Sequence, residues 1–114
     1  MSDPVYEYRV YEAAPGMIDA LQKRFEATTL RIFERYGIKV IGFWIPVVGS
    51  NNELHYIVEW PDYDTMHRTW PAFRSDPEWL AARRETDKDG PLVARVRNQL
   101  WRIAPFFAPR RQAP

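Results

Sequence analysis

Alternating apolar and polar residues mark four extended segments along this chain. In the first, residues 5–11, successive side chains would point to opposite faces of a sheet. The other three are rich in β-branched and aromatic residues, which favour strands. We therefore predict strands over residues 5–11, 38–48, 53–60 and 93–103, with Gly49-Ser50-Asn51-Asn52 as the turn of a hairpin between the middle two.

A second pattern, with apolar residues at helical spacing, lies between the first two strands. It begins near Met17, continues through Leu21 and Ile32, and reaches Tyr36. Gly37 follows and suits the left-handed position that ends a helix. One helix is predicted here.

Two further helix start signals follow the hairpin. Asp62 is a suitable N-cap for a helix from residue 63, and Pro71 predicts a kink or break near Trp70. Asp76 then precedes Pro77, which suits the first helical position. This second signal predicts a helix over residues 77–86.

The resulting order, β-α-β-β-α-β, is the ferredoxin-like arrangement of the α+β class. Right-handed crossovers place the first and third strands at the centre of a four-stranded antiparallel sheet, with the helices on one face. Length and composition suit one domain, predicted over residues 1–109, and residues 110–114 are predicted to be a disordered tail.

The more apolar side of the sheet is expected to meet the helices. We assign to it Tyr6, Tyr8, Val10, Leu54, Tyr56, Val58 and Trp60. The opposite side is expected to carry Glu7, Arg9, Tyr11, His55, Ile57, Glu59, Arg97, Gln99 and Trp101. This second side is too aromatic for a solvent-exposed face, which predicts a two-fold homodimer with the two sheets facing each other.

Composition narrows the function classes. The formal charge of +1 gives no reason to expect nucleic-acid binding, and no apolar run is long enough for membrane insertion. The absence of cysteine excludes disulfides and thiolate chemistry and fits a cytoplasmic location, as does the lack of signal-peptide features after Met1. Aromatic residues make up 15% of the chain, and such residues are enriched in ligand pockets and interfaces.

The polar residues assigned to the second side of the sheet form the main candidate site. His55, Arg9 and Glu59 are the candidate catalytic residues, because imidazole titrates near neutral pH and a guanidinium can hold a carboxylate or enolate oxygen. The candidate substrate-binding residues are Glu7, Tyr11, Trp44, Arg97 and Trp101. The alternative is that the charges pair across strands and only stabilise the assembly, with the tryptophans as packing residues.

Several short motifs resemble those of the NIPSNAP family, in the dimeric α/β barrel superfamily. They are Tyr6-Glu7-x-Arg9-x-Tyr11, Gly42-Phe43-Trp44, Asn52-Glu53-Leu54, Glu59-Trp60, Arg68-x-x-Trp70-x-Ala72-Phe73-x-x-Asp76-Pro77-Glu78-Trp79 and the ending Phe106-Phe107-Ala108-Pro109. Pro71 departs from the pattern. The resemblance implies a homodimeric barrel but no single reaction, since the superfamily includes cofactor-free monooxygenases, haem-handling enzymes, isomerases and lyases.

Together these features predict a homodimer that binds a small aromatic or oxygen-rich molecule. If it is an enzyme, we expect cofactor-independent oxygenase, isomerase or lyase chemistry of the acid–base or monooxygenase type. The alternative is a non-catalytic interaction or structural protein whose barrel is filled by side chains. No metal site and no cofactor are predicted; haem, with His55 or His67 as axial ligand, rests on fold analogy alone.

Overall fold

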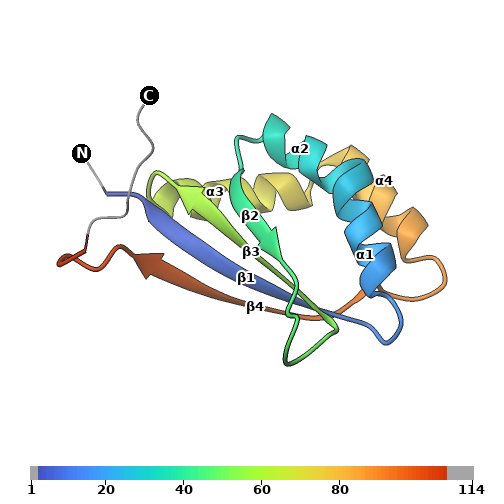
Figure 1. The fold of residues 1–114 in the computed structure, drawn as a ribbon. Helices are drawn as coiled ribbons and strands as arrows, with labels where there is room; N and C mark the ends of the chain where they lie inside the picture. The colour runs from blue at the N-terminus through green and yellow to red at the C-terminus, as the bar shows by residue number, and fades with distance from the viewer. Residues whose placement is uncertain (1–2, 108–114) are drawn as a thin grey trace.

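A computed structural model describes residues 3–107 as a single antiparallel sheet with helices packed on one face (Figure 1). In chain order the elements are β1 (Val5–Ala13), α1 (Ile18–Arg24), the π-helical turn η1 (Phe25–Thr29), α2 (Leu30–Arg35), β2 (Lys39–Trp44), β3 (Glu53–Trp60), α3 (Tyr63–Arg74), α4 (Pro77–Thr86) and β4 (Val93–Arg102). This confirms the predicted ferredoxin-like α+β fold. The predicted tail, 110–114, lies outside the described residues.

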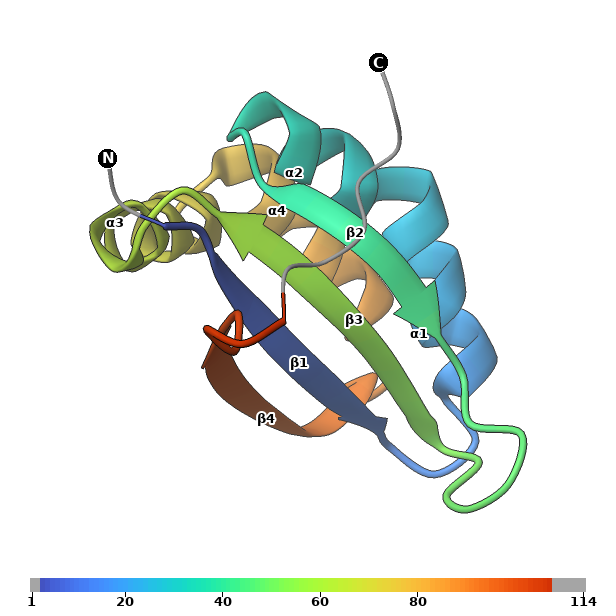
Figure 2. The same cartoon turned by 60° about the vertical axis from the view of Figure 1, so that its left-hand side comes forward.

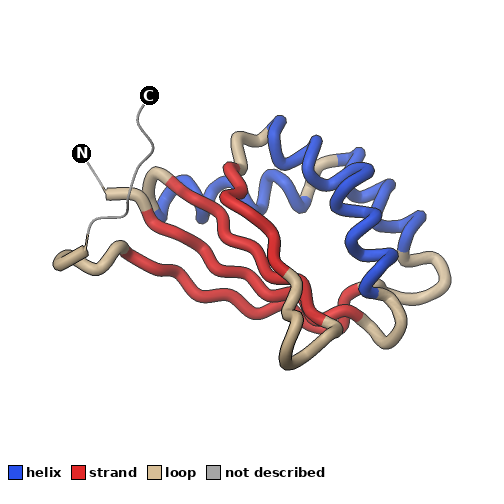
Figure 3. The backbone as a smooth tube through the Cα atoms, viewed as in Figure 1, coloured by secondary structure: helices blue, strands red, loops and turns tan. Residues whose placement is uncertain are grey.

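The strands lie in the order β2-β3-β1-β4 and all neighbours are antiparallel (Figure 2). β1 and β3 are therefore the central strands, as predicted. Figure 3 shows the two layers, with every helix on the same side of the strands. In the described part of the chain, no helix has the length and apolar character needed to cross a membrane.

Local capping signals produce the helix starts that the sequence predicts. The side chain of Asp62 accepts a hydrogen bond from the backbone N–H of Thr65 at 2.7 Å, and α3 begins at the next residue, Tyr63. Asp76 accepts from the backbone N–H of Trp79 at 3.0 Å and Pro77 opens α4. Side-chain capping satisfies backbone donors that the first helical turn leaves unpaired.

The other elements differ in detail from the sequence prediction. A kink or break was predicted near Trp70, and the break is wrong, because α3 continues through Pro71 to Arg74. Pro71 lies in the last turn, so its missing N–H removes only one hydrogen bond near the helix end. β2 ends at Trp44, four residues earlier than predicted.

The first helical region is interrupted by the π-helical turn η1, which the apolar spacing did not predict. The carbonyl of Arg24, just before this turn, accepts a hydrogen bond from the hydroxyl of Thr29 at 3.3 Å. A π turn inserts an extra residue and shifts the helical stripe that follows it. Arg24 and Phe25, at the junction of α1 and this turn, are both buried, although only Phe25 belongs to the predicted apolar stripe.

The predicted faces are correct for β3 and reversed for β1. Leu54, Tyr56, Val58 and Trp60 are all buried against the helices. Glu7 pairs with Val58, Arg9 with Tyr56 and Tyr11 with Leu54, so these three residues share the helix-facing side. Tyr6, Tyr8 and Val10 consequently lie on the opposite side, which we call the open face. Residues directly opposite in an antiparallel pair share a face, and this register decides the orientation of β1.

Candidate functional site

The carboxylate of Glu7 is the most deeply buried charge on the helix-facing side, at 0% exposure. One oxygen accepts the indole N–H groups of Trp60 at 3.0 Å and Trp70 at 2.8 Å. The other accepts from Arg9 at 2.7 Å and from the amide of Asn98 at 3.0 Å. Burial would raise the pKa of Glu7, but the charge of Arg9 and the donated hydrogen bonds lower it overall. Glu7 is therefore an ionised structural anchor at neutral pH.

The guanidinium of Arg9 lies beside this carboxylate and stacks over Trp70, 4.4 Å from the ring centre. It also donates to the hydroxyls of Tyr56 at 2.8 Å and Tyr11 at 3.3 Å. Burial lowers the pKa of Arg9, but the oxygens of Tyr56, Tyr11 and Glu7 raise it overall. Arg9 thus remains a fixed positive charge in the interior.

Tyr11 is positioned by hydrogen bonds that it accepts. Its hydroxyl receives one hydrogen bond from Arg9 and another from Tyr56 at 3.2 Å. Burial raises the pKa of Tyr56 well above its ordinary value, so Tyr56 remains a neutral donor. No hydrogen bond donated by the Tyr11 hydroxyl occurs among residues 3–107. Its proton is consequently available to an acceptor outside the protein.

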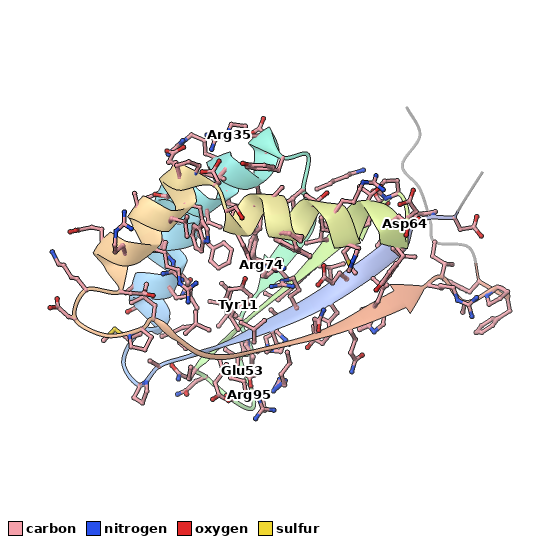
Figure 4. The ribbon with its side chains drawn as sticks, turned by 180° about the vertical axis from the view of Figure 1, so that it is seen from behind. Tyr11, Arg35, Glu53, Asp64, Arg74 and Arg95 are labelled. Carbon is pink, nitrogen blue, oxygen red and sulfur yellow. The ribbon has the colours of Figure 1, made fainter. Side chains whose placement is uncertain are left out.

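A cavity of about 490 Å³ lies between the sheet and the helices, beside the start of β4. Its apolar walls include Tyr11, Trp70, Phe73 and Trp79. Figure 4 shows Tyr11 and Arg74 in the space between sheet and helices, whereas Glu53 and Arg95 lie on the far side of the sheet. The volume is within the range of pockets that bind small organic molecules.

Positive charge is concentrated around this cavity. Arg9 and Arg24 line its interior, and the exposed Arg74 and Arg83 line its outer part. Arg24 is paired with Asp87 at 3.0 Å, and Arg83 approaches the same carboxylate at 3.5 Å. Arg74 has no ion pair within the described chain. The arrangement favours an anion over a cation or a neutral molecule.

The open face has a separate polar cluster centred on His55. Its Nδ1 lies 2.6 Å from the Tyr8 hydroxyl, and its Nε2 lies 2.9 Å from a carboxylate oxygen of Glu53. Arg97 approaches the other oxygen of Glu53 at 3.5 Å. With Glu53 ionised, Nε2 carries the hydrogen and Nδ1 accepts from Tyr8. A carboxylate that orients an imidazole beside a hydroxyl is an arrangement able to transfer a proton.

The remaining predicted site residues also lie on the open face. Glu59 pairs with Lys39 at 2.6 Å and accepts from Tyr6 at 3.0 Å. Trp44 borders a hollow of about 290 Å³ together with Tyr8, Ile45, Pro46 and His55. Trp101 stacks on Tyr8 with ring centres 4.9 Å apart. The structure therefore divides the predicted site, with Glu7, Arg9 and Tyr11 on one face of the sheet and the other five residues on the opposite face.

The NIPSNAP family model matches residues 6–108, nearly the whole chain. The chain belongs to the NIPSNAP family. This confirms the resemblance drawn from the motifs of β1, β2 and the α3–α4 region. A search of curated proteins finds no match.

Solved structures share the NIPSNAP fold at low sequence identity. A NIPSNAP-like domain protein from Burkholderia xenovorans, described as uncharacterised, has a TM-score of 0.81 and 21% identity, covering 96% of this chain and 92% of that one. A dimeric ferredoxin-like protein from an uncultured marine organism has a TM-score of 0.58 and 10% identity, covering 87% and 86%. A candidate antibiotic biosynthesis monooxygenase from Nitrosomonas europaea has a TM-score of 0.58 and 8% identity, covering 85% and 95%. At these identities the likeness concerns the fold alone.

The residues of this NIPSNAP domain do not fit haem. Both ring nitrogens of His55 are already hydrogen-bonded, and His67 lies on the exposed surface of α3, stacked against Tyr63 with ring centres 5.9 Å apart. Neither histidine lines the larger cavity. Within residues 3–107, no group of three or more metal-ligating side chains is placed to hold an ion.

Sequence reasoning missed three residues that the structure brings to the cavity. Arg24 lay off the predicted apolar stripe, Arg74 was not among the candidate residues, and Trp70 was assigned to the core. A usable signal was present for one of them, since Trp70 belongs to the most specific motif and its indole N–H requires a buried acceptor. Nothing in the local pattern identifies Arg24, because an arginine beside an apolar stripe is ordinarily a surface residue.

Proposed function

We propose that this NIPSNAP domain binds a small organic acid in the cavity between the sheet and the helices. The observation that carries the proposal is the Tyr11 hydroxyl, which accepts from Arg9 and Tyr56 but donates to no described residue. A hydroxyl that accepts two hydrogen bonds is a stronger donor, and a ligand oxygen would complete its set. Arg9 supplies fixed positive charge beside it, and the aromatic walls suit a flat ring.

The cavity also suits chemistry that passes through an anionic form of the ligand. Positive groups fixed in a partly buried site stabilise charge that develops on an enolate or phenolate oxygen. This is compatible with cofactor-independent oxygenase, isomerase or lyase chemistry. Glu7 would not be the base in such a reaction, because its pKa is lowered and its carboxylate already accepts four hydrogen bonds. Glu7 instead stabilises the structure, which is the role that the sequence analysis gave to the paired charges as the alternative to a catalytic site.

Tyr11→Phe tests the binding proposal with little change in packing. Isothermal titration calorimetry with benzoate should detect binding by the wild type and a loss of about tenfold in the variant, the usual effect of removing a hydrogen bond to a charged group. His55→Gln, on the opposite face, is the matched control and should bind benzoate as the wild type does. Equal affinities for wild type and Tyr11→Phe would contradict the proposal.

A second candidate function follows from the Tyr8–His55–Glu53 row. We propose that it transfers protons for a ligand in the adjoining hollow, with His55 as base and Trp44 as the ring against which the ligand packs. Exchange of the Tyr8 hydroxyl proton with water, followed by NMR, can test this. If His55 accepts the phenolic proton, His55→Gln should slow this exchange; an unchanged exchange rate would exclude the role.

We further propose that two copies pair through the open face. Trp44 and Trp101 are 51% and 40% exposed there, an unusual amount of aromatic surface for a face in water. The dimeric state of one protein with this fold is compatible with the idea. Light scattering should give a dimer for the wild type and a monomer for Trp101→Arg, and a wild-type monomer at micromolar concentration would disprove the pairing.

A further inference from the structure

We propose that the ligand of the cavity is a dianion, and that Arg24 binds the second of its two acidic groups. This inference rests on the proposed binding function, which itself requires only one acidic group, held by Tyr11 and Arg9. Arg24 lies in α1 rather than in the sheet and lines the same cavity. It therefore offers a second point of attachment, separate from the first.

Arg24 is an interior cation with incomplete hydrogen bonding. Its side chain is only 5% exposed. The Nη1 atom donates to Thr86 and Asp87, each at 3.0 Å. The Nε atom is buried and has no hydrogen-bond partner in residues 3–107. Buried donors are almost always satisfied, so an unpaired one beside a cavity indicates an acceptor that arrives with a ligand.

Arg24 is held in place at its backbone and at its guanidinium. Arg24 is the last residue of α1, and its carbonyl accepts a hydrogen bond from the Thr29 hydroxyl at the end of the π turn η1. Its guanidinium lies over the Trp79 ring of α4, 5.1 Å from the ring centre. Single π turns in helices are frequent at functional sites. The cation of Arg24 is thus fixed at the wall of the cavity, next to such a turn.

The charge around the cavity favours more than one acidic group on the ligand. Five arginines belong to the residues that line it, Arg9, Arg24, Arg74, Arg83 and Arg95, and Asp87 is the lining carboxylate. With Glu7, which is paired with Arg9, five positive charges are set against two negative ones, a net charge of +3. A monoanion would leave +2 of this excess, and a dianion would leave +1. The exposed Arg74 and Arg83 at the outer part would also attract such a ligand from solution.

A matched pair of probe ligands tests the inference. Benzene-1,3-dicarboxylate and 3-carbamoylbenzoate have nearly the same shape and differ by one negative charge. In calorimetry on the full chain, the wild type should bind the dicarboxylate at least about tenfold more tightly than 3-carbamoylbenzoate. A hydrogen bond to a charged group has about that effect. In Arg24→Gln the two probes should bind within about threefold of each other, and benzoate should lose less affinity than the diacid does.

Asp87→Asn is the second variant, chosen because it retains Arg24 and the shape of the loop. Removing the competing carboxylate should widen the preference for the diacid beyond that of the wild type. Equal binding of the two probes by the wild type would overturn the dianion while leaving the proposed function intact. A preference that persists in Arg24→Gln would overturn the assignment of Arg24. Failure to bind benzoate or either probe would reject both proposals.

Discussion

The two faces of the sheet place similar charged residues in different surroundings. On the helix-facing side, Glu7 and Arg9 form a largely buried ion pair, and four donors occupy the carboxylate. On the open face, Glu53 and His55 form a comparable contact while both remain partly exposed. The comparison shows that burial, rather than residue type, decides whether a polar cluster holds the fold together or remains adaptable.

The strongest test of this contrast compares two carboxylates. Glu7→Ala should destabilise the fold by about 3–5 kcal/mol, because Arg9 would remain as a buried cation without its partner. Glu59→Ala, which removes a half-buried carboxylate on the open face, should cost about 0–1 kcal/mol. Urea denaturation measures both. Similar losses for the two variants would show that the faces do not differ as described.

Two hydroxyl deletions make a finer comparison. Tyr56→Phe removes the acceptor for the Arg9 Nε hydrogen in the interior and should cost about 1–3 kcal/mol. Tyr8→Phe removes the partner of His55 on the open face, where water can replace it, and should cost about 0.5–1 kcal/mol. The same denaturation experiment applies. A larger loss for Tyr8→Phe would reverse the predicted order.

The dependence of stability on pH should come from the helix side of the molecule. The Tyr36 hydroxyl, the backbone N–H of Trp79 and the Arg35 side chain hold the pKa of Asp76 at about 2, and the pKa of Glu7 is also lowered. Folded pKa values below the unfolded ones mean that this stability is present above about pH 5 and is lost as the pH falls toward 2.

Replacing Asp76 isolates its share of this effect. Asp76→Asn should flatten the decline of melting temperature between pH 5 and pH 2, because the amide does not titrate. Glu12→Gln on the open face, a carboxylate outside the buried network, is the control and should keep the wild-type slope. A slope that is unchanged in Asp76→Asn would contradict the assignment.

The smallest expected effect concerns the open face alone. A Cβ atom added at Gly42 would lie 2.9 Å from the ring of Trp44, so Gly42→Ala must displace that ring. The ring is half exposed and can move, which limits the cost to less than about 1 kcal/mol. The indole N–H resonance of Trp44 should shift in ¹H–¹⁵N spectra while the melting temperature changes little. A large loss of stability would show that this face is less adaptable than the comparison implies.

Much of this molecule was determined by the sequence itself. The alternation in β3, the caps at Asp62 and Asp76 and the hairpin turn act over a few residues, so the local pattern was sufficient to predict the element order and the ferredoxin-like topology. The family motifs could be recognised in the same way. Arg9 was also identified as a candidate catalytic residue and Tyr11 as a candidate binding residue, although on the wrong face.

Only the tertiary structure decided which face of β1 meets the helices and where the cavity lies. Alternation groups Glu7 with Arg9 and Tyr11, but it cannot show which way the group points, because that depends on pairing with β3, more than 40 residues away in the chain. The more apolar side of β1 was predicted to meet the helices, and this was wrong. Hydrogen bonds from Trp60, Trp70 and Asn98 offset the cost of burying Glu7 there instead. Likewise, Arg24 became part of the cavity through contacts with Trp79 of α4 and with Asp87, which are not visible in its neighbours along the chain.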